Sequence, residues 1–463
     1  KRQQLFNTMC VLERSGKEWL VIMKELFLKR MEEYLKEEYP KYLETLEEDA
    51  YRGLRVNTSK ISVEEFLKLG VCSLRPSSIC PQSFYLPKEV EGLGNHPAHL
   101  AGLFYMQEPS ASSAVEVLGV EEGDWVLDMC AAPGGKSTQI AAKLNHSGFL
   151  VSNEIESKRA MALLSNMERL GFSECMITNA HPKDLEKEMH GWFDKVLVDA
   201  PCSGEGMFKK HSKAMEDWSV EHVEACAQRQ LHILDSAYET LKEGGILVYS
   251  TCTYSMEENE HVVYEFLKKY ADMELIDSGV SFGRCGFAYK DLEVEKVRRI
   301  FPMDEGEGHF VAKFKKNGSS SYDRRKEVTS KIDPCAASFL KQQLTLLPSY
   351  TLQIQDKVYA KNTPFIKLKN IHILRQGILC GNIVKNRFEP HQHFYSAQVH
   401  QGCFVQIYDM NEEETQRYLK GNLLPVTGYK GYTALTWKHH PIAFAKGDGS
   451  VLKNKYPKGM RLR

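Results

Sequence analysis

The sequence contains no uninterrupted run of eighteen apolar residues, so it does not predict a transmembrane helix. The first 22 residues also lack the continuous apolar core of a secretory signal peptide, and we expect them to form a peripheral leader. The composition, with 42% hydrophobic and 26% charged residues, is typical of globular proteins. We therefore expect a cytoplasmic, monomeric protein that has no membrane partner.

The twelve cysteines of the chain include no CxxC pair, and no cysteines and histidines have the spacing of zinc ligands. The sequence therefore predicts no metal site. Thiols in a reduced compartment are most often buried and inert. Only the neighbouring residues in the sequence can therefore indicate that a particular cysteine is reactive.

The sequence also has no excess of charge of one sign, since its formal net charge is only −1. The charge is nevertheless unevenly distributed: residues 421–463 contain eight Lys and Arg against one acid, Asp448. Such a basic block can bind phosphates, and we predict that it contacts nucleic-acid phosphates through Lys453, Lys455, Lys458 and Arg461. Tyr432, Trp437 and Tyr456 are candidates for stacking on bases, although core packing is favoured for Trp437. The alternative is that the basic block is only a solvated surface.

The length of 463 residues suggests about three domains. Apolar residues at helical spacing before Pro40 predict a helix in an N-terminal extension, residues 23–100. From 101 to 317, apolar runs alternate with helical stretches, which predicts an α/β domain with a parallel sheet covered on both faces. The runs are 125–131, 148–154, 175–180, 193–201 and 244–251, with a closing strand at 309–316. After a polar segment at 317–327, we expect a middle domain at 325–390 and a small β-rich module at 391–463.

The stretch GGKST, residues 134–138, resembles the end of a nucleotide-triphosphate-binding loop. That loop requires a glycine at position 130, where this chain has Cys130, and no partner motif follows. A strand that ends at Asp128, a turn of small residues and a helix N-terminus predict instead a ligand site at the carboxyl edge of the sheet. Glu154 ends the next strand, where an acidic side chain can bind both ribose hydroxyls. Both NAD and S-adenosylmethionine fit, but GxGxxG is absent, which weakens NAD.

Cys202 and Cys252 follow the ends of two strands that are expected to be neighbours, in the contexts DAPCSG and STCTYS. A parallel sheet would bring both thiols to the same edge as the cofactor. Methylation of pyrimidine carbon 5 uses such groups: a thiolate adds to carbon 6, which makes carbon 5 nucleophilic, and the carbon 5 proton must later leave. A carboxyl group beside ring nitrogen 3 stabilises the charge that develops, and Asp199 is placed for that role. The alternative is two inert core thiols.

The motifs DMCAAPGGKSTQIA, DAPCSGEG and STCTYS, in this order and spacing, resemble those of the RNA cytosine-5 methyltransferase family of the nucleolar-protein/Sun type. RGLRVNT (52–58), YMQEPSA (105–111) and QRQLHIL (228–234) resemble further motifs of that family, so the resemblance covers roughly residues 25–315. The final segment, 431–461, is similar to the PUA-like RNA-binding module of one bacterial branch, the ribosomal RNA small-subunit methyltransferase F type. The resemblance implies a Rossmann-like S-adenosylmethionine-dependent methyltransferase sheet with an N-terminal α+β extension and two small C-terminal domains, the last PUA-like. It also implies ribosomal RNA, or the small ribosomal subunit, as the partner.

The resemblance implies a role for each matching residue. Cys252 is expected to be the nucleophile, Cys202 to aid proton removal or thiol release, and Asp199 to contact both donor and base. Glu154 is expected to bind the ribose, and Arg159 to lie near the cofactor. The turn that would hold the methionine part comprises Cys130, Ala131, Ala132, Pro133, Gly134, Gly135 and Lys136, with Lys136 at the methionine carboxylate.

The chain departs from the family pattern at two places. Asn179 stands where the family often has an Asp near the adenine, and we predict that it takes the same part. After DAPCSG the family often has a stretch rich in Thr and Arg, and in this chain Lys209 and Lys210 are expected to face phosphates.

Two other functions remain as alternatives. A DNA cytosine-5 methyltransferase would use the cysteine directly after proline, Cys202, as its nucleophile. A ribosome-assembly factor with an inactive methyltransferase fold would bind RNA without transferring a methyl group.

Overall fold

The computed structural model describes residues 18–210, 212–319 and 327–462. Most of the expected leader, residues 1–17, lies outside the described residues, and residues 18–22 begin helix α2 (Glu18–Leu35). Within the described ranges, every helix is too short or too polar to cross a membrane.

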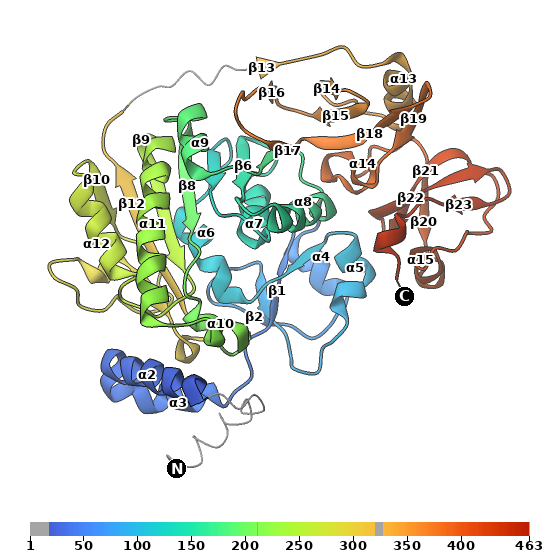
Figure 1. The fold of residues 1–463 in the computed structure, drawn as a ribbon. Helices are drawn as coiled ribbons and strands as arrows, with labels where there is room; N and C mark the ends of the chain where they lie inside the picture. Colours follow the sequence, from blue (N-terminus) through green and yellow to red (C-terminus); the bar gives the residue numbers. More distant parts are fainter. Residues whose placement is uncertain (1–17, 211, 320–326, 463) are drawn as a thin grey trace.

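The N-terminal part combines two helices with a small sheet. Helix α2 is followed directly by the 3-10 turn η2 (Lys36–Glu38) and by α3 (Tyr39–Leu46), so Pro40 does not end the helical segment and lies in the first turn of α3, where a proline is tolerated. Met31 and Leu35 of α2 are buried against Trp218 and Tyr254 of the next domain, which confirms the predicted amphipathic helix. The sheet has the order β2 (Arg75–Pro76), β3 (Ser83–Tyr85), β1 (Gly53–Val56), β4 (Phe104–Met106). The helices α4 (Val63–Lys68) and α5 (Pro97–Leu100) flank it (Figure 1).

A nine-stranded sheet forms the centre of the molecule, and its five parallel strands confirm the predicted Rossmann-like α/β domain. The expected closing strand β12 is antiparallel to β9. In spatial order the main path runs β10 (Met273–Ile276), β12 (His309–Lys316), β9 (Leu241–Thr251), β8 (Phe193–Asp199), β5 (Trp125–Asp128), β6 (Phe149–Asn153), β7 (Cys175–Thr178) and β17 (Ile373–Gln376), and β11 (Arg298–Ile300) pairs with β12.

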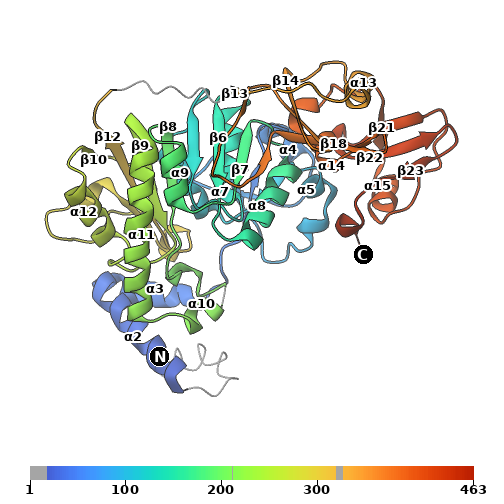
Figure 2. The ribbon, with the colours of Figure 1, turned by 45° about the horizontal axis from the view of Figure 1, so that its top comes forward.

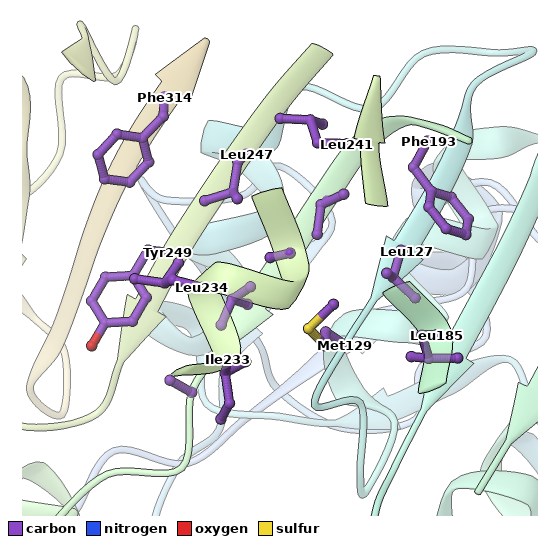
Figure 3. Close-up of a cluster of buried hydrophobic side chains, with 14 of the residues drawn as sticks. Leu127, Met129, Leu185, Phe193, Ile233, Leu234, Leu241, Leu247, Tyr249 and Phe314 are labelled. Atoms are coloured by element: carbon purple, nitrogen blue, oxygen red, sulfur yellow. The ribbon is translucent and has the colours of Figure 1, made fainter. Parts of the chain in front are cut away.

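Helices cover both faces of this sheet (Figure 2). Helices α9 (Pro182–Glu188), α11 (Val220–Thr240) and α12 (Glu260–Lys269) lie on one face, and α6 (Ser113–Leu118), α7 (Gly135–Leu144) and α8 (Ser157–Leu170) on the other. Successive side chains of a strand point to opposite faces, so Leu127 joins the core under α11 whereas Val126 joins the core under α7 and α8. Figure 3 shows the first core, in which Leu127 and Met129 lie among side chains such as Leu234 and Leu185. These two cores fix the strand ends that carry the site.

The C-terminal half contains two four-stranded sheets and a two-stranded pair of β13 (Glu327–Val328) and β16 (Phe365–Ile366). The first has the order β14 (Tyr350–Ile354), β15 (Lys357–Lys361), β18 (Ile378–Val384), β19 (Arg387–Pro390), with α13 (Pro334–Gln343) and α14 (Gln392–Ser396) beside it. The second has the order β20 (Ile407–Met410), β21 (Lys430–Trp437), β22 (His440–Asp448), β23 (Leu452–Asn454), with α15 (Glu412–Leu419), which confirms the predicted β-rich final module.

The middle segment is joined to the catalytic sheet in a way that the sequence does not indicate. Its strand β17 pairs antiparallel with β7 and extends the sheet at that edge (Figure 1). Lys60 of the N-terminal part reaches the same region: its side chain is buried, and its ammonium donates to the carbonyl oxygens of Ala101 and Ser396, each at 2.8 Å. The final module packs in turn on the N-terminal part, where Trp437 meets His96 edge to face.

Candidate active site

The turn after β5 is built around a buried acid and a glycine. Asp128 is fully buried, and its Oδ2 accepts a hydrogen bond from Ser137 Oγ at 2.7 Å, while its Oδ1 has no partner. The pKa of Asp128 is raised to about 7, mainly by burial and to a smaller extent by nearby Asp199, while the hydrogen bond from Ser137 and the charge of Lys136 oppose this rise. Gly134 has a φ of 111°, a conformation that other residues rarely adopt, and it directs the chain into the N-terminus of α7.

A pocket of about 220 Å³ lies between this turn and the segment after β4. A Cβ atom at Gly135 would lie 3.0 Å from Gln107 Nε2 and 3.3 Å from Tyr105 Cε1, so a side chain at this position would crowd the pocket wall. Of the turn residues predicted to hold the methionine part, those that line the pocket are Cys130, Ala131, Ala132, Pro133, Gly135 and Lys136; Asp128 and Asp199 line it too.

Glu154 lies at the end of β6 with a side chain suited to a polar ligand. The residue is 2% exposed, its Oε1 accepts a hydrogen bond from Glu156 N, and its Oε2 accepts none. Arg159 Nη1 lies 3.3 Å from that Oε2, and its Nη2 donates to Ala132 O at 2.8 Å. An unsatisfied buried carboxylate oxygen is costly, and a ribose hydroxyl is a group that would satisfy it. The residues present therefore fit S-adenosylmethionine.

Asn179 directly follows β7, and its side chain contacts the loop after β6. Its Nδ2 donates to the carbonyl oxygens of Glu154 at 2.7 Å and Ile155 at 3.0 Å, and its Oδ1 accepts from Ser157 Oγ. The side-chain amide thus holds the loop that carries Glu154. A direct contact of Asn179 with the adenine stays a prediction.

The thiols of Cys202 and Cys252 lie together at the carboxyl edge of the sheet. Their Sγ atoms are 3.2 Å apart, and the backbone N of Cys252 lies 3.4 Å from Cys202 Sγ. The strands that carry them, β8 and β9, are parallel neighbours, with Asp199 opposite Ser250. The expectation that the two cysteines meet at one edge is confirmed.

Asp199 connects the thiols with the pocket. Its Oδ1 accepts a hydrogen bond from Ser250 Oγ at 2.8 Å, and its Oδ2 accepts one from Lys136 Nζ at 2.7 Å. Burial alone would lower the pKa of Lys136, but Asp199 and the nearby Cys252 outweigh burial and hold that pKa above its usual value. Lys136 therefore provides a positive charge beside both Asp199 and Cys252, whereas the sequence suggests only the methionine carboxylate as its partner.

Two side chains near the thiols, Glu258 and His309, are not predicted from the sequence. Glu258 is fully buried and accepts hydrogen bonds from Ser203 N at 3.0 Å and from Gln230 Nε2 at 2.8 Å. His309, at the start of β12, lies 2.8 Å from Ser110 Oγ through its Nδ1. Ser110 and Gln230 fall within the motifs YMQEPSA and QRQLHIL, which could have pointed to their partners; Glu258 follows STCTYS by only three residues.

A cleft of about 980 Å³ lies between the N-terminal part and the loop after β8. Lys209 and Lys210 both line it, but Lys209 Nζ donates to Thr45 O at 3.0 Å, so this ammonium is partly engaged within the protein. The guanidinium of Arg75 lies 4.1 Å from the centroid of the Tyr85 ring. The other lining residues include Tyr51, Arg52 and Lys88, together with the acids Glu48 and Asp49.

The basic block lies on the surface of the final module. Lys453, Lys455 and Lys458 are exposed, Arg461 is half-buried, and Lys453 Nζ lies 3.0 Å from Asp448 Oδ2. Trp437 and Tyr456 are each 2% exposed, so both rings belong to the core, and the suggestion that Tyr456 stacks on bases is wrong. Across the residues that the structure describes, no three His, Cys, Asp or Glu side chains are grouped as a metal site would require.

Four family models match the chain. They are 16S rRNA methyltransferase RsmB/F over residues 115–315, the N-terminal domain of 16S rRNA methyltransferase RsmF over 23–109, the RsmF rRNA methyltransferase first C-terminal domain over 338–397, and the methyltransferase RsmF PUA domain over 405–462.

Curated proteins match over nearly their whole length. Ribosomal RNA small subunit methyltransferase F of Citrobacter koseri is 31% identical over 477 residues, which is 95% of this chain and 96% of that protein. The protein of the same name from Aliivibrio fischeri is 32% identical, over 88% of this chain and 90% of its own.

Solved structures match over about two thirds of the chain. A methyltransferase homolog protein from Pyrococcus horikoshii has a TM-score of 0.57 and 29% identity, and the match covers 67% of this chain and 99% of that one. NSun6 from Pyrococcus horikoshii with SFG has a TM-score of 0.56 and 25% identity, over 63% of this chain and 98% of that one.

Proposed function

The chain belongs to the family of ribosomal RNA small subunit methyltransferase F, whose cofactor is S-adenosylmethionine, and we propose that it methylates carbon 5 of cytosine in 16S ribosomal RNA. The observation that carries the cytosine assignment is the pair of thiols 3.2 Å apart, beside a carboxylate and a lysine at the edge of the donor pocket. Covalent activation of a pyrimidine uses a nucleophilic thiol, and the Asp199 and Lys136 side chains beside this pair are the charged groups that such a step needs.

Cys252 is the nucleophile in this proposal. Its thiolate adds to carbon 6 of the cytosine, and carbon 5 becomes electron-rich. Bound S-adenosylmethionine supplies an electrophilic methyl group. The carbon 5 proton then leaves, the bond between carbon 6 and Cys252 Sγ breaks, and Cys202 aids this release. The positive charge of Lys136 beside Cys252 favours the thiolate that begins the sequence of steps.

Asp199 and Lys136 act on the ring. As the thiolate adds, negative charge develops over ring nitrogen 3, and a hydrogen-bond donor there stabilises it; in this site the donor is the Lys136 ammonium, which the Asp199 carboxylate orients by accepting a hydrogen bond from it. The Asp199–Lys136 pair is a partly buried, hydrogen-bonded unit that lies between the thiols and the pocket. Its neighbours Ser250 and Ser137 hold Asp199 and Asp128 in place, so the site is organised before the base arrives.

Glu154 and the turn of residues 130–136 hold the donor. Glu154 offers to the ribose hydroxyls its Oε2, which accepts no hydrogen bond although Arg159 lies 3.3 Å from it, and Arg159 also donates to the carbonyl of Ala132. The base leaves its stack to enter the site. The cleft lined by Arg52, Arg75 and Lys210 provides charge for the neighbouring RNA, and the basic block of the final module provides more.

A trapping experiment tests this assignment. Purified protein is incubated with S-adenosylmethionine and 16S ribosomal RNA, either free or in small subunits, and covalent protein–RNA adducts are resolved on denaturing gels. We expect Cys252→Ala to lose turnover and to form no adduct. Cys202→Ala should still attack the base but should release it poorly, so that an adduct accumulates. Cys380→Ala, a buried thiol on β18 of the first C-terminal sheet, is the matched control and should retain activity.

Other outcomes support other functions. An adduct that requires Cys202 and survives Cys252→Ala overturns the proposed roles of the two thiols and is the pattern of a DNA-type cytosine methyltransferase. If the wild-type protein binds the subunit but transfers no methyl group to either form of the RNA, an assembly factor is the better description. Sequencing of the methylated RNA identifies the base and the ring position.

A further inference from the structure

Glu258 lies behind Cys202 and has no part in the proposed methyl transfer. Its carboxyl group is fully buried, Oε2 accepts two hydrogen bonds, and Oε1 accepts none. A buried carboxylate oxygen without a partner costs stability, so packing alone does not explain why an acid occupies this position.

The contacts of Glu258 converge on the segment that carries Cys202. Ser203 N donates to Glu258 Oε2, and Gln230 Nε2 donates both to Oε2 and to Pro201 O, at 2.8 and 3.1 Å. The hydroxyl of Tyr249 lies 2.6 Å from the Glu258 carbonyl and 2.9 Å from Gln230 Oε1. The residues on either side of Cys202 are therefore tied, directly or through Gln230, to the one carboxyl group.

Charges of opposite sign face the two thiols. Lys136 interacts electrostatically with Cys252, although Asp199 offsets part of its charge. The hydrogen bond to Cys252, burial, and the negative charges of Cys252 and Glu258 all hold the pKa of Cys202 well above its usual value. Two thiols 3.2 Å apart compete for one proton when the pair has lost the other, and the surrounding charges decide which sulfur keeps it.

We propose that Glu258 is a positioning residue that keeps the shared proton of the pair on Cys202 and so makes Cys252 the thiolate. In catalysis, which rests on the proposed function, Cys202 then acts as a thiol that donates a hydrogen bond to the departing Cys252 sulfur. The carbon 5 proton goes to water, and Cys202 keeps its own proton throughout. Of the two roles that the sequence leaves open for Cys202, aid to thiol release is the one that this charge arrangement supports.

The effect of Glu258 depends on pH because the group itself titrates. Its pKa is raised to about 7, mainly by burial and to a smaller extent by nearby Glu205, while the hydrogen bonds from Ser203 and Gln230 oppose this rise. Other titratable groups on the surrounding elements are Cys226 of α11 and Tyr249 of β9. Below pH 7 Glu258 is mostly protonated and has little effect on which thiol keeps the shared proton. Above pH 7 it is ionised, and its negative charge favours the proton on Cys202.

Limited alkylation of the free protein tests the proposal without RNA or donor. The full chain is treated with substoichiometric iodoacetamide at pH 8, and the modified fractions of Cys202 and Cys252 are measured by peptide mass spectrometry. We expect Cys252 to be the major product. Glu258→Gln keeps the shape and removes the charge, so the ratio of modified Cys202 to Cys252 should rise about three- to tenfold, as expected for a shift of half to one pKa unit. Lys136→Gln should raise the same ratio by weakening the Cys252 thiolate.

The control is Glu257→Gln, the neighbouring acid, which pairs with Arg30 and should leave the ratio unchanged. An unchanged ratio in folded Glu258→Gln overturns the proposal. If that variant does not fold, the wild-type protein is alkylated from pH 6 to 8: the Cys202 fraction should fall as pH rises through 7, and a constant fraction overturns the proposal equally. A failure of the alkylation test leaves the adduct experiment intact, and a failure of the cytosine assignment leaves the alkylation ratio intact.

Discussion

The active-site edge of the sheet and the basic block of the final module are the two regions to which the sequence assigns function, and they differ most in burial. At the sheet edge, Asp128, Glu154 and Glu258 are buried, and each has one carboxylate oxygen without a hydrogen-bond partner. In the basic block, Lys453, Lys455 and Lys458 are exposed to solvent.

Because of this difference in burial, charged side chains act differently in the two regions. A buried group interacts at short range in a low-dielectric setting, so its exact neighbours decide its protonation and its strength. An exposed lysine acts through a screened field, and the number of charges matters more than the position of any one. Single substitutions should therefore have large effects at the sheet edge and small, salt-dependent effects in the basic block.

The largest effect is expected for Asp199→Asn. The change removes the negative charge that pairs with Lys136 and disturbs the group placed to act on the ring. We expect the single-turnover methylation rate to fall by a factor on the order of 10²–10³, as on loss of a preorganised transition-state contact. Asp235→Asn, which alters a surface pair with Lys269, is the control and should leave the rate unchanged. A fall of less than threefold in the Asp199 variant would show that this carboxylate has no part in the chemistry.

A smaller effect, limited to the binding of S-adenosylmethionine, is expected for Glu154→Gln. The variant replaces a buried carboxylate, one oxygen of which accepts no hydrogen bond, by a neutral amide. Hydrogen bonds to a charged group contribute about 1.5–3 kcal/mol, so we expect the affinity for S-adenosylmethionine to fall roughly tenfold or more. Isothermal titration calorimetry measures it. Glu156→Gln, whose side chain is exposed, serves as the control. Equal affinities for wild type and Glu154→Gln would remove Glu154 from the donor site.

An arginine can be compared directly between the two regions. Arg55 is 1% exposed, and its guanidinium donates to Gln107 Oε1, Gly135 O and Thr138 Oγ1, which ties the N-terminal sheet to the donor turn. Arg55→Met should lower the midpoint of thermal unfolding, with a loss of about 3 kcal/mol from the broken buried network. Arg461→Met, in the basic block, should lower the midpoint much less, because Arg461 is only half-buried and its Nε donates one 3.3 Å hydrogen bond, to Tyr456 O, in place of a buried network. Equal shifts in the two variants would mean that burial does not distinguish these sites.

The same contrast explains what the sequence can predict. The strand ends that carry Asp128, Glu154, Asp199, Cys202 and Cys252 follow from alternating strands and helices, because a parallel sheet places them at one edge. The Lys136–Asp199 pair and the position of Glu258 behind Cys202 do not follow, because side-chain contacts between separate elements depend on packing that local pattern does not encode. Strand β17 is missed for a related reason: its four residues gain their strand partner from β7, almost 200 residues away.

In the basic block, composition provides only a count of charges, and the structure shows that they are not equivalent. Tyr456, a candidate for stacking from its sequence context, is buried, and Lys453 is paired with Asp448. Composition predicts that a surface is basic, but it does not predict which cations already have an acidic neighbour.

The smallest effects are expected in this block, and they should be visible mainly in the salt dependence. If Lys455, Lys458 and Arg461 each meet one phosphate of single-stranded RNA, changing all three to Gln should reduce the slope of log K against log salt by about 2. Fluorescence anisotropy with an RNA fragment at several salt concentrations measures the slope. Changing three exposed lysines of the catalytic domain, Lys268, Lys290 and Lys315, is the control of equal charge and should leave the slope unchanged.

Lys453→Gln alone should alter the slope least, because its ammonium lies 3.0 Å from Asp448 and would have to leave that partner to reach a phosphate. If the triple variant keeps the wild-type slope, the block is a solvated surface; if Lys453→Gln changes the slope as much as Lys455→Gln does, the pair with Asp448 does not limit phosphate binding.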